Sequence, residues 1–442
     1  MSTDRLFGTD GVRGIANVDL TPDFAMELGL AAGELVRGSV VTIGRDTRRS
    51  GPMLASAVKA GLQSLGTDTI DLGVLPTGGI SHLTRMSSAD FGVVISASHN
   101  PAPDNGIKFI GRDGSKLADS MEDAIEERLR KGPPWSRATG EGIGTDFPMD
   151  DALQQYVAYL TDQSAYTFRG ISVVLDCANG AAYRAAPMLF ERLHAEVTAF
   201  GVDPDGTNIN AGCGATNPSF LASKTKGRLG LAFDGDADRL VAVDEDGIPA
   251  NGDVVMAVIA RHMKEQGKLK GDRVVATVMS NLGFRKAMDR LGIELIETRV
   301  GDRYVLEGMR EHNAILGGEQ SGHIIFTETA RTGDGLLTGI RLLEVLAGTG
   351  RELRELRKET ITEYPQVMRN VTVAAKDRLS DARSVWGAVE AAEERLGGDG
   401  RVLVRASGTE PMVRVMVEAR TRDQALAIVE ELSSIIRTEL GG

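Results

Sequence analysis

Hydrophobic and polar positions along the chain predict short buried strands that alternate with helices. The first clear unit begins with an apolar strand at residues 40–44, which passes into the polar residues Arg45 and Asp46. A helical pattern follows at about 50–65, and a second strand is expected at 69–73. A strand, loop, helix and strand of about thirty residues has the size of a βαβ unit.

This unit recurs twice further along the chain. The second copy spans residues 171–201 and the third spans 273–301, each with a strand, a polar loop, a helix and a second strand. Two such units could arise by chance in any α/β chain, but three with similar loops predict three related domains.

The remaining chain predicts a smaller α+β domain. Its expected elements are a strand at 370–373, a helix at 382–396, strands at 401–405 and 412–419, and a helix at 422–440. Stretches rich in glycine, proline and polar residues predict the domain boundaries, which divide the chain into residues 1–150, 151–252, 253–366 and 367–442.

Composition narrows the class of protein. With 42% hydrophobic and 25% charged residues, the 442-residue chain is typical of a globular protein, and 53 glycines against 5% aromatic residues indicate many tight turns. A net charge of −12 without a basic tract argues against general nucleic-acid binding. Only Cys177 and Cys213 occur, so a reducing compartment is expected. The first ten residues lack a signal-peptide core, and no run of 18 apolar residues exists, so we expect a cytoplasmic protein.

The apolar strand at 91–95 leads into a loop that suggests covalent chemistry. A serine at the end of such a strand is expected to be exposed, so Ser98 is a candidate covalent carrier. His99 and Lys108 are then its positive or proton-handling neighbours. Alternatively, Ser96 and Ser98 only form a hydrogen-bonded turn.

Three aspartates directly after another apolar strand indicate a cation site. Asp234, Asp236 and Asp238 alternate with small residues, and an extended or bent segment would place them on one side, where they repel one another without a cation. Oxygen ligands favour Mg²⁺ or Ca²⁺. An EF-hand is excluded because Arg239 stands where that loop needs glycine. A solvated acidic turn is the alternative, and Arg239 would offset the excess charge or bind a phosphate.

Two glycine-bearing loops are candidates for binding an anion or a sugar. Residues 7–14 contain three glycines and Arg13, which suit an anion, although a plain turn is equally compatible. In the loop at 317–323, Glu319 and Ser321 suit sugar hydroxyl groups, whereas a single histidine such as His323 is more often structural.

A loop in the last domain contains the donors of a phosphate site. Hydroxyl groups, the exposed backbone amide of Gly408 and two guanidinium groups converge between two strands, at Arg405, Ser407, Gly408, Thr409 and Arg414. A hairpin without a ligand is the alternative.

These motifs, in this order, resemble the α-D-phosphohexomutases over essentially the whole chain. Residues 318–323, 407–411 and 208–214 are most similar to the bacterial members that act on glucosamine phosphates. The resemblance implies an α/β fold of three related domains with mixed sheets and a smaller C-terminal α+β domain in a heart-shaped arrangement. Asn217 departs from the pattern, since histidine is expected before Pro218.

The resemblance also implies roles for the motif residues. Ser98 would be phosphorylated and would bind one Mg²⁺ together with Asp234, Asp236 and Asp238. The groups around the transferring phosphate would be Arg13, His99, Lys108 and Arg239, and those at the sugar would be Glu319, Ser321 and His323. Arg405, Ser407, Gly408, Thr409 and Arg414 would hold the phosphate that does not react. Lys108 is favoured for proton transfer, with Arg13 and His323 as alternatives.

The implied reaction interconverts glucosamine 6-phosphate and glucosamine 1-phosphate through a sugar 1,6-bisphosphate, which is also an activator, and feeds UDP-N-acetylglucosamine synthesis. The partner is then a small sugar phosphate, with no nucleic acid or membrane, and the chain is a monomer or homodimer. A phosphoglucomutase or phosphomannomutase that acts on neutral hexose phosphates is the alternative enzyme. A non-catalytic protein that binds sugar phosphates or Ca²⁺ is disfavoured by the intact Ser98, aspartate and phosphate motifs.

Overall fold

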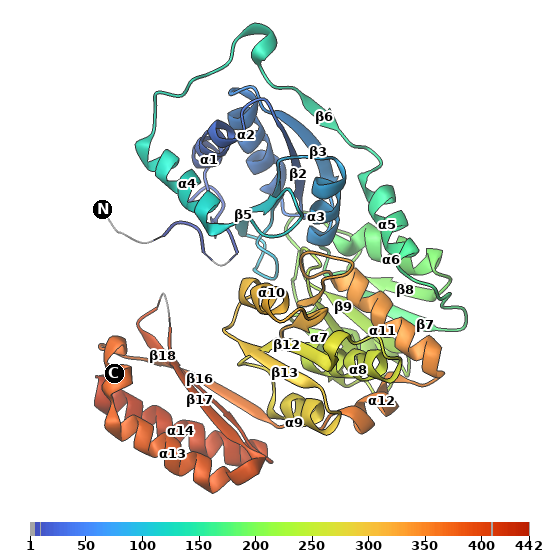
Figure 1. The fold of residues 1–442 in the computed structure, drawn as a ribbon, viewed down its shortest axis with the longest axis vertical. Coiled ribbons are helices and arrows are strands. Elements are labelled where there is room, and N and C mark those ends of the chain that lie inside the picture. The colour runs from blue at the N-terminus through green and yellow to red at the C-terminus, as the bar shows by residue number, and fades with distance from the viewer. Residues whose placement is uncertain (1–4, 9, 408–409, 442) are drawn as a thin grey trace. The chain divides into compact units, whose positions relative to one another are not determined.

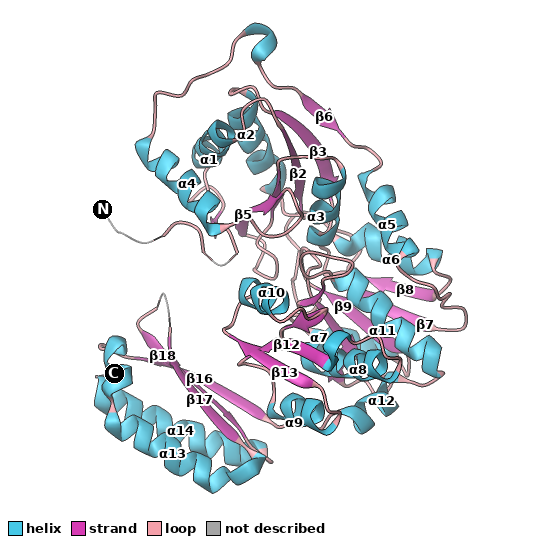
Figure 2. Ribbon diagram, in the orientation of Figure 1, coloured by secondary structure: helices cyan, strands magenta, loops and turns pink. Residues whose placement is uncertain are grey.

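The computed structural model describes residues 5–8, 10–407 and 410–441, in which strands and helices alternate along most of the chain (Figures 1 and 2). The strands are β1 (Val12–Ile15), β2 (Val40–Arg45), β3 (Asp68–Val74), β4 (Phe91–Ile95), β5 (Asp104–Gly111), β6 (Asp146–Pro148), β7 (Ser172–Asp176), β8 (Glu196–Phe200), β9 (Leu229–Phe233), β10 (Leu240–Val243), β11 (Pro249–Ala250), β12 (Arg273–Thr277), β13 (Glu294–Thr298), β14 (Leu316–Gly318), β15 (Ile324–Phe326), β16 (Gln366–Thr372), β17 (Arg401–Ala406) and β18 (Met412–Glu418).

The α-helices are α1 (Pro22–Leu35), α2 (Gly51–Gln63), α3 (Thr77–Met86), α4 (Asp119–Lys131), α5 (Ala152–Asp162), α6 (Ala182–Arg192), α7 (Pro218–Thr225), α8 (Gly252–Glu265), α9 (Leu282–Arg290), α10 (Asp302–Glu311), α11 (Gly335–Thr349), α12 (Leu353–Thr360), α13 (Arg383–Leu396) and α14 (Arg422–Leu440). Short 3-10 helices lie at Gly140–Gly142, Lys270–Asp272, Lys376–Asp381 and Gly397–Asp399. None of the described helices is both long and apolar enough to cross a membrane.

Three sheets share one strand order, which confirms the predicted repeat. In each, a central strand (β2, β7 or β12) pairs in parallel with a strand on either side. A fourth strand (β5, β10 or β15) then pairs antiparallel with the third. These are the mixed sheets expected of three related α/β units. The strand predicted to reach residue 301 ends instead at Thr298, because Gly301 has a φ of +133° and precedes helix α10.

The last hairpin of each repeated sheet bears one of the candidate loops. Ser98 lies between β4 and β5, the aspartate turn between β9 and β10, and Glu319 between β14 and β15. The three loops therefore occupy equivalent positions in three related sheets. The repeat thus places a serine, three aspartates and a glutamate at the same position of three related sheets.

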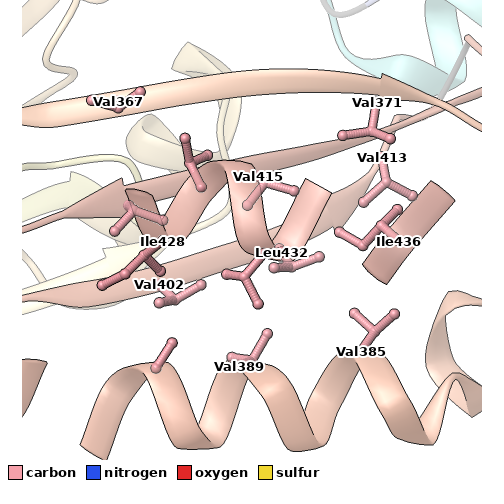
Figure 3. Close-up of a cluster of buried hydrophobic side chains, with 14 of the residues drawn as sticks. Val367, Val371, Val385, Val389, Val402, Val413, Val415, Ile428, Leu432 and Ile436 are labelled. Carbon is pink, nitrogen blue, oxygen red and sulfur yellow. The ribbon is translucent and has the colours of Figure 1, made fainter. Parts of the chain in front are cut away.

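The C-terminal α+β domain has its own core. Its antiparallel sheet has the order β16-β18-β17. Figure 3 shows side chains of these strands facing α13 and α14, and the buried cluster includes Val371, Val413, Val415, Val389 and Leu432. Val413, Val415 and Val417 of β18 all belong to this cluster, because side chains two residues apart in a strand point to the same face of the sheet.

Contacts divide the chain into two compact units. The second contains residues 280–293 and the chain from 360 onward, and the first contains the rest. Helix α9 therefore groups with the C-terminal domain, although the third repeated unit supplies it. Within that second unit, the Asn281 side chain donates to Tyr364 O at 2.9 Å and to Glu418 Oε1 at 3.2 Å.

Candidate active site

Ser98 is buried against the hairpin turn of the second sheet. Its Oγ donates a hydrogen bond of 2.6 Å to Asp234 Oδ2, 136 positions away in the chain. Only 1% of the residue is exposed, so the expectation of an exposed serine is wrong. The reason is close packing, because a Cβ on Gly235 would lie 2.4 Å from the Ser98 carbonyl oxygen.

The backbone at Ser98 also forms the predicted serine turn. Ser98 N donates to Ser96 Oγ at 2.9 Å, and Ser98 has a left-handed φ of +50°. This turn uses the backbone N–H and leaves the hydroxyl group directed at Asp234. A hydrogen-bonded turn and a reactive serine are therefore compatible.

The three aspartates form a buried carboxylate cluster. Asp234, Asp236 and Asp238 each place an oxygen within 4.8 Å of the others. Their segment is a tight turn rather than an extended strand, since Ala237 has a φ of +57°. Burial and the neighbouring carboxylates raise the pKa of Asp234 well above its usual value.

The cluster fits a small divalent cation. Asp236 Oδ1 and Asp238 Oδ1 are buried without a hydrogen-bond partner. Such oxygens cost free energy unless a cation or donor meets them, and carboxylate oxygens are the ligands that Mg²⁺ and Ca²⁺ prefer. The residues therefore support metal binding at this turn.

Lys108 provides positive charge beside the aspartates. Its Nζ lies 3.0 Å from Asp236 Oδ2, 3.5 Å from Asp10 Oδ1 and 3.9 Å from Asp238 Oδ2. Burial opposes the charge, but Asp236 and Asp238 outweigh it and raise the pKa of Lys108. Lys108 is therefore held as a charged ammonium group.

His99 differs from Lys108 in its charge. Its Nδ1 lies 3.5 Å from Ser98 Oγ. Burial, followed by the positive charges of Arg239 and Arg13, lowers the pKa of His99 to about 4. The His99 ring is therefore neutral at neutral pH, so of the two roles expected for it this geometry favours proton handling over a positive charge.

Arg13 and Arg239 face the same carboxylates from different elements. Arg13 lies in β1 and forms an ion pair with Asp10. Arg239 Nε lies 3.9 Å from Asp234 Oδ2 and 3.8 Å from Asp238 Oδ1. The Nε atoms of both arginines are buried without a hydrogen-bond partner. These unused donors suit an oxyanion such as phosphate.

His323 connects the loop of the third sheet to the aspartate turn. Its Nδ1 lies 3.4 Å from Asp238 Oδ2, and Gly333 N donates to its Nε2 at 3.0 Å. Burial opposes protonation of the ring, but Asp238 raises the pKa of His323 to about 9. The Gly333 contact nevertheless needs an unprotonated Nε2, so this geometry belongs to the neutral ring. A cation at Asp238 would favour that form by offsetting the carboxylate.

The remaining residues of this loop form a local network. Glu319 Oε1 accepts from Gly301 N at 3.0 Å, and Ser321 Oγ lies 3.4 Å from Glu319 Oε2. Ser321 is exposed. The remaining acceptor capacity of Glu319 and the exposed Ser321 hydroxyl suit a polyhydroxylated ligand.

The candidate phosphate loop lies in the second unit. Arg405 of β17 is directly opposite Arg414 of β18, and burial together with Arg414 lowers the pKa of Arg405. Like charges in a cross-strand pair are destabilising, so an anion would stabilise this pair. Ser407 is buried, whereas Gly408 and Thr409 lie outside the described residues. Glu410 Oε2 accepts from Arg414 at 3.2 Å.

The sequence patterns did not single out several residues that contact these groups. Thr77 Oγ1, at the start of α3, donates to Asp236 Oδ2 at 2.7 Å. Lys376 Nζ donates to Ser407 O at 2.9 Å. The fully buried Arg48 binds the Ser98 loop. Of these three residues, only Arg48 could have been found from the sequence. It follows β2, and the carboxyl end of β2 lies beside that of β4, which precedes Ser98.

Comparisons with known proteins agree with these features. The α/β/α domains I, II and III of phosphoglucomutase/phosphomannomutase match residues 4–134, 154–247 and 251–364, and the C-terminal domain matches 368–435. A phosphoglucosamine mutase of Streptomyces coelicolor is 49% identical, over 99% of this chain and 100% of its own. One of Desulforudis audaxviator is 48% identical, over 98% and 97%. The solved structure of a phosphoglucomutase/phosphomannomutase family protein from Burkholderia thailandensis has a TM-score of 0.82 at 25% identity, covering 100% of this chain and 99% of its own.

Proposed function

The chain belongs to the phosphoglucomutase/phosphomannomutase family, and from this premise we propose that it acts as a phosphoglucosamine mutase. The reaction interconverts glucosamine 6-phosphate and glucosamine 1-phosphate, for use in UDP-N-acetylglucosamine synthesis. The observation that carries the proposal is the Ser98 hydroxyl, 2.6 Å from a buried aspartate cluster with cationic side chains around it. The full-length relatives with that name support the amino sugar as substrate.

Ser98 would act as the phosphoryl carrier. Phosphoserine gives its phosphoryl group to one hydroxyl of the sugar phosphate, and the resulting 1,6-bisphosphate reverses and returns its other phosphoryl group to Ser98 Oγ. The bisphosphate is thus both an intermediate and an activator. The attacking sugar hydroxyl loses one proton and Ser98 Oγ gains one, so no net proton is needed; Lys108, held as an ammonium, would supply the proton to Ser98 Oγ and recover the one that the sugar hydroxyl releases. Positioning and charge stabilisation supply most of the catalysis in phosphoryl transfer.

One Mg²⁺ would be held by Asp234, Asp236, Asp238 and the oxygen of Ser98, and the three carboxylates within 4.8 Å of one another support this assignment. When bound, it would stabilise the negative charge of the transferring phosphoryl group. The Arg13 and Arg239 guanidiniums would hold the same group through their unpartnered Nε donors. His99 would remain neutral beside Ser98 Oγ.

The sugar and its second phosphate would be held by separate loops. Glu319 and Ser321 would bind sugar hydroxyls, and His323 would orient Asp238 from the same loop. Arg405, Ser407 and Arg414, together with Gly408 and Thr409, would bind the phosphate that does not react. A phosphate carries a charge of about −2, which the Arg405–Arg414 pair would offset. We also propose the four domain boundaries given above and a cytoplasmic location.

A coupled assay with glucosamine, glucose and mannose 6-phosphates tests the function. Selection by one polar group is worth about ten- to two-hundred-fold in kcat/KM, and we expect glucosamine 6-phosphate to lead by at least about tenfold. Equal or reversed values would favour the phosphoglucomutase or phosphomannomutase alternative. Inactivity on all three sugars, together with no chain one phosphate heavier by intact mass, would instead indicate a non-catalytic binding protein.

A further inference from the structure

Arg48 lies at the centre of the loop that bears Ser98. Its side chain is fully buried, and it follows β2 in the turn that precedes α2. Nη2 donates to Ser98 O at 3.0 Å and to Asn100 O at 2.8 Å. Nη1 donates to Asp104 O at 2.9 Å and also to Pro101 O. One guanidinium therefore binds four carbonyl oxygens of the loop.

Asp46 completes the set of acceptors around Arg48. Its Oδ2 accepts from Arg48 Nε at 2.9 Å, and its Oδ1 accepts from Arg48 N at 2.9 Å. A guanidinium has five N–H donors in a fixed planar fork, and here all five meet an acceptor. Ser96 Oγ also donates to Asp46 Oδ2, at 2.5 Å. The same Ser96 oxygen accepts from Ser98 N, so the network binds both the backbone N–H and the backbone C=O of Ser98.

The second domain reinforces two of these contacts. Asn210 Nδ2 donates to Ser98 O at 2.9 Å and to Asn100 O at 3.1 Å. Thr47 and Arg49 bind the backbone of the same domain at Asn179 and Gly206. The segment 46–49 therefore connects the loop of Ser98 to the domain that provides the aspartate turn.

This arrangement has an electrostatic consequence at Ser98. A carbonyl oxygen close to a phosphoryl dianion would repel it, and buried carbonyl groups need donors. Arg48 and Asn210 supply those donors at the Ser98 and Asn100 carbonyls. They also hold Ser98 in a left-handed conformation, which is sterically unfavourable for a residue other than glycine.

We propose that Arg48 is a positioning residue for phosphoryl transfer, which fixes the Ser98 loop by binding its carbonyl groups while Asp46 fixes Arg48. The proposal rests on the function proposed above, in which Ser98 is the phosphoryl carrier. Arg48 does not touch the reacting atoms and acts only through the backbone of the loop.

The planar fork of arginine is essential to this role. An ammonium has three donors on a single atom, so Arg48→Lys keeps the charge but can donate to at most three of the five acceptors. A displacement of about 1 Å from the reacting geometry can cost about 10²-fold in rate. Binding of the sugar phosphate uses other loops, so its affinity is expected to stay unchanged.

The experiment compares Arg48→Lys, Asn210→Ala and a control, Arg357→Lys. Arg357 also binds a buried carboxylate, Asp244, at 3.1 Å and the Ile248 carbonyl, at residues outside the proposed site. For each full-length variant, kcat and KM for glucosamine 6-phosphate are measured below the midpoint of thermal unfolding. Amide hydrogen exchange of residues 97–106 is measured alongside.

We expect Arg48→Lys to lower kcat about 10²-fold with unchanged KM, and to accelerate exchange at 97–106. Asn210→Ala is expected to show smaller changes in the same direction, and Arg357→Lys to show neither. Unchanged kcat in Arg48→Lys, a kcat loss without faster exchange, or an equal loss in Arg357→Lys would overturn the proposal. An inactive wild-type protein would contradict the proposed function instead, and the exchange of the loop would still measure whether Arg48 positions it.

Discussion

At Ser98 a buried hydroxyl group and a left-handed backbone occur in one residue. Each is unfavourable alone, because a polar group is desolvated and the backbone is strained. Asp234 satisfies the hydroxyl group, and Arg48 satisfies the carbonyl. The chemistry of the site therefore depends on single residues whose partners come from distant parts of the chain.

Ser98→Ala is expected to abolish mutase turnover and to keep the fold. Alanine has the same Cβ and no hydroxyl, so the cost is the loss of the Asp234 hydrogen bond, worth about 1–3 kcal/mol. Turnover is measured by the coupled assay, and intact mass should show that the phosphorylated fraction disappears. Wild-type turnover in this variant would exclude Ser98 as the carrier.

Asp236→Asn is expected to lower activity at least about 10²-fold and to weaken its dependence on Mg²⁺. The amide removes one charge from the cluster and also disrupts the contacts of Asp236 Oδ2 with Lys108 and Thr77. Activity is titrated against Mg²⁺ after treatment with a chelator. Asp90→Asn, at a surface carboxylate 3.9 Å from Arg112, is the control. A wild-type protein that is fully active without any divalent cation would contradict the metal site.

At the scale of elements, the site is built from three equivalent hairpins. The β4–β5, β9–β10 and β14–β15 turns meet at short distances, since the aspartate turn contacts Ser98 on one side and His323 on the other. Helix α3 supports this arrangement by placing Thr77 on Asp236. The packing of the β4–β5 loop against the β9–β10 turn therefore sets the geometry that the proposed phosphoryl transfer needs.

Gly235→Ala is expected to lower kcat by about 10²-fold through displacement of the aspartate turn. Its added Cβ would lie 2.4 Å from Ser98 O and 2.8 Å from Asn210 Nδ2, which forces the two loops apart. Gly387→Ala is the control, because its Cβ would meet nothing within 4 Å. If Gly235→Ala retained wild-type kcat, close packing of the two hairpins would not be needed for transfer.

His82 of helix α3 is expected to make the stability of the fold decrease at acidic pH. The ring of His82 stacks on Tyr159 at 3.6 Å, its Nδ1 is buried without a hydrogen-bond partner, and burial and Arg85 lower its pKa to about 4. The unfolded chain binds a proton below about pH 6.5 and the native state does not, so stability falls as the pH drops from 6.5 to 4.

The shift corresponds to an upper bound of about 3 kcal/mol over this pH range, and solvent screening of the partly exposed ring makes the actual contribution smaller. His82→Gln removes the titrating group, so its thermal midpoint should fall less steeply between pH 6.5 and 4 than that of the wild-type protein. Parallel pH profiles for the two proteins would show that His82 does not contribute to acid sensitivity.

At the scale of the molecule, the candidate groups are divided between two compact units. The first contains Ser98, the aspartate cluster and the loop of Glu319, and the second contains Arg405 and Arg414. The proposed function assigns the reacting phosphate to groups of the first unit and the other phosphate to groups of the second.

Arg405→Ala is expected to raise KM for glucosamine 6-phosphate more than it lowers kcat. Loss of a charge-assisted contact worth about 1.5–3 kcal/mol corresponds to about ten- to hundredfold in KM. Arg369→Ala is the control, because Arg369 is an exposed residue of β16 in the same sheet. A large loss of kcat with unchanged KM would place Arg405 at the reacting phosphate instead.

The elements and their repeat could be predicted from the sequence. Apolar runs and turn residues are local signals, so the parallel pairs of β2 with β3, β7 with β8 and β12 with β13 could be predicted from their spacing. The aspartate cluster was also predictable, because its members are adjacent in the chain. The loop motifs likewise predicted Ser98 as a candidate carrier and indicated the resemblance to the family.

The contacts of those residues, in contrast, depend on how the sheets pack against one another. The burial of Ser98 against Asp234, the five acceptors of Arg48 and the contact of Thr77 with Asp236 join residues far apart in sequence. The charge states of His99 and Lys108 also depend on desolvation and on neighbours from other elements. No local pattern encodes these properties, because they arise when separate sheets pack and exclude water from the groups between them.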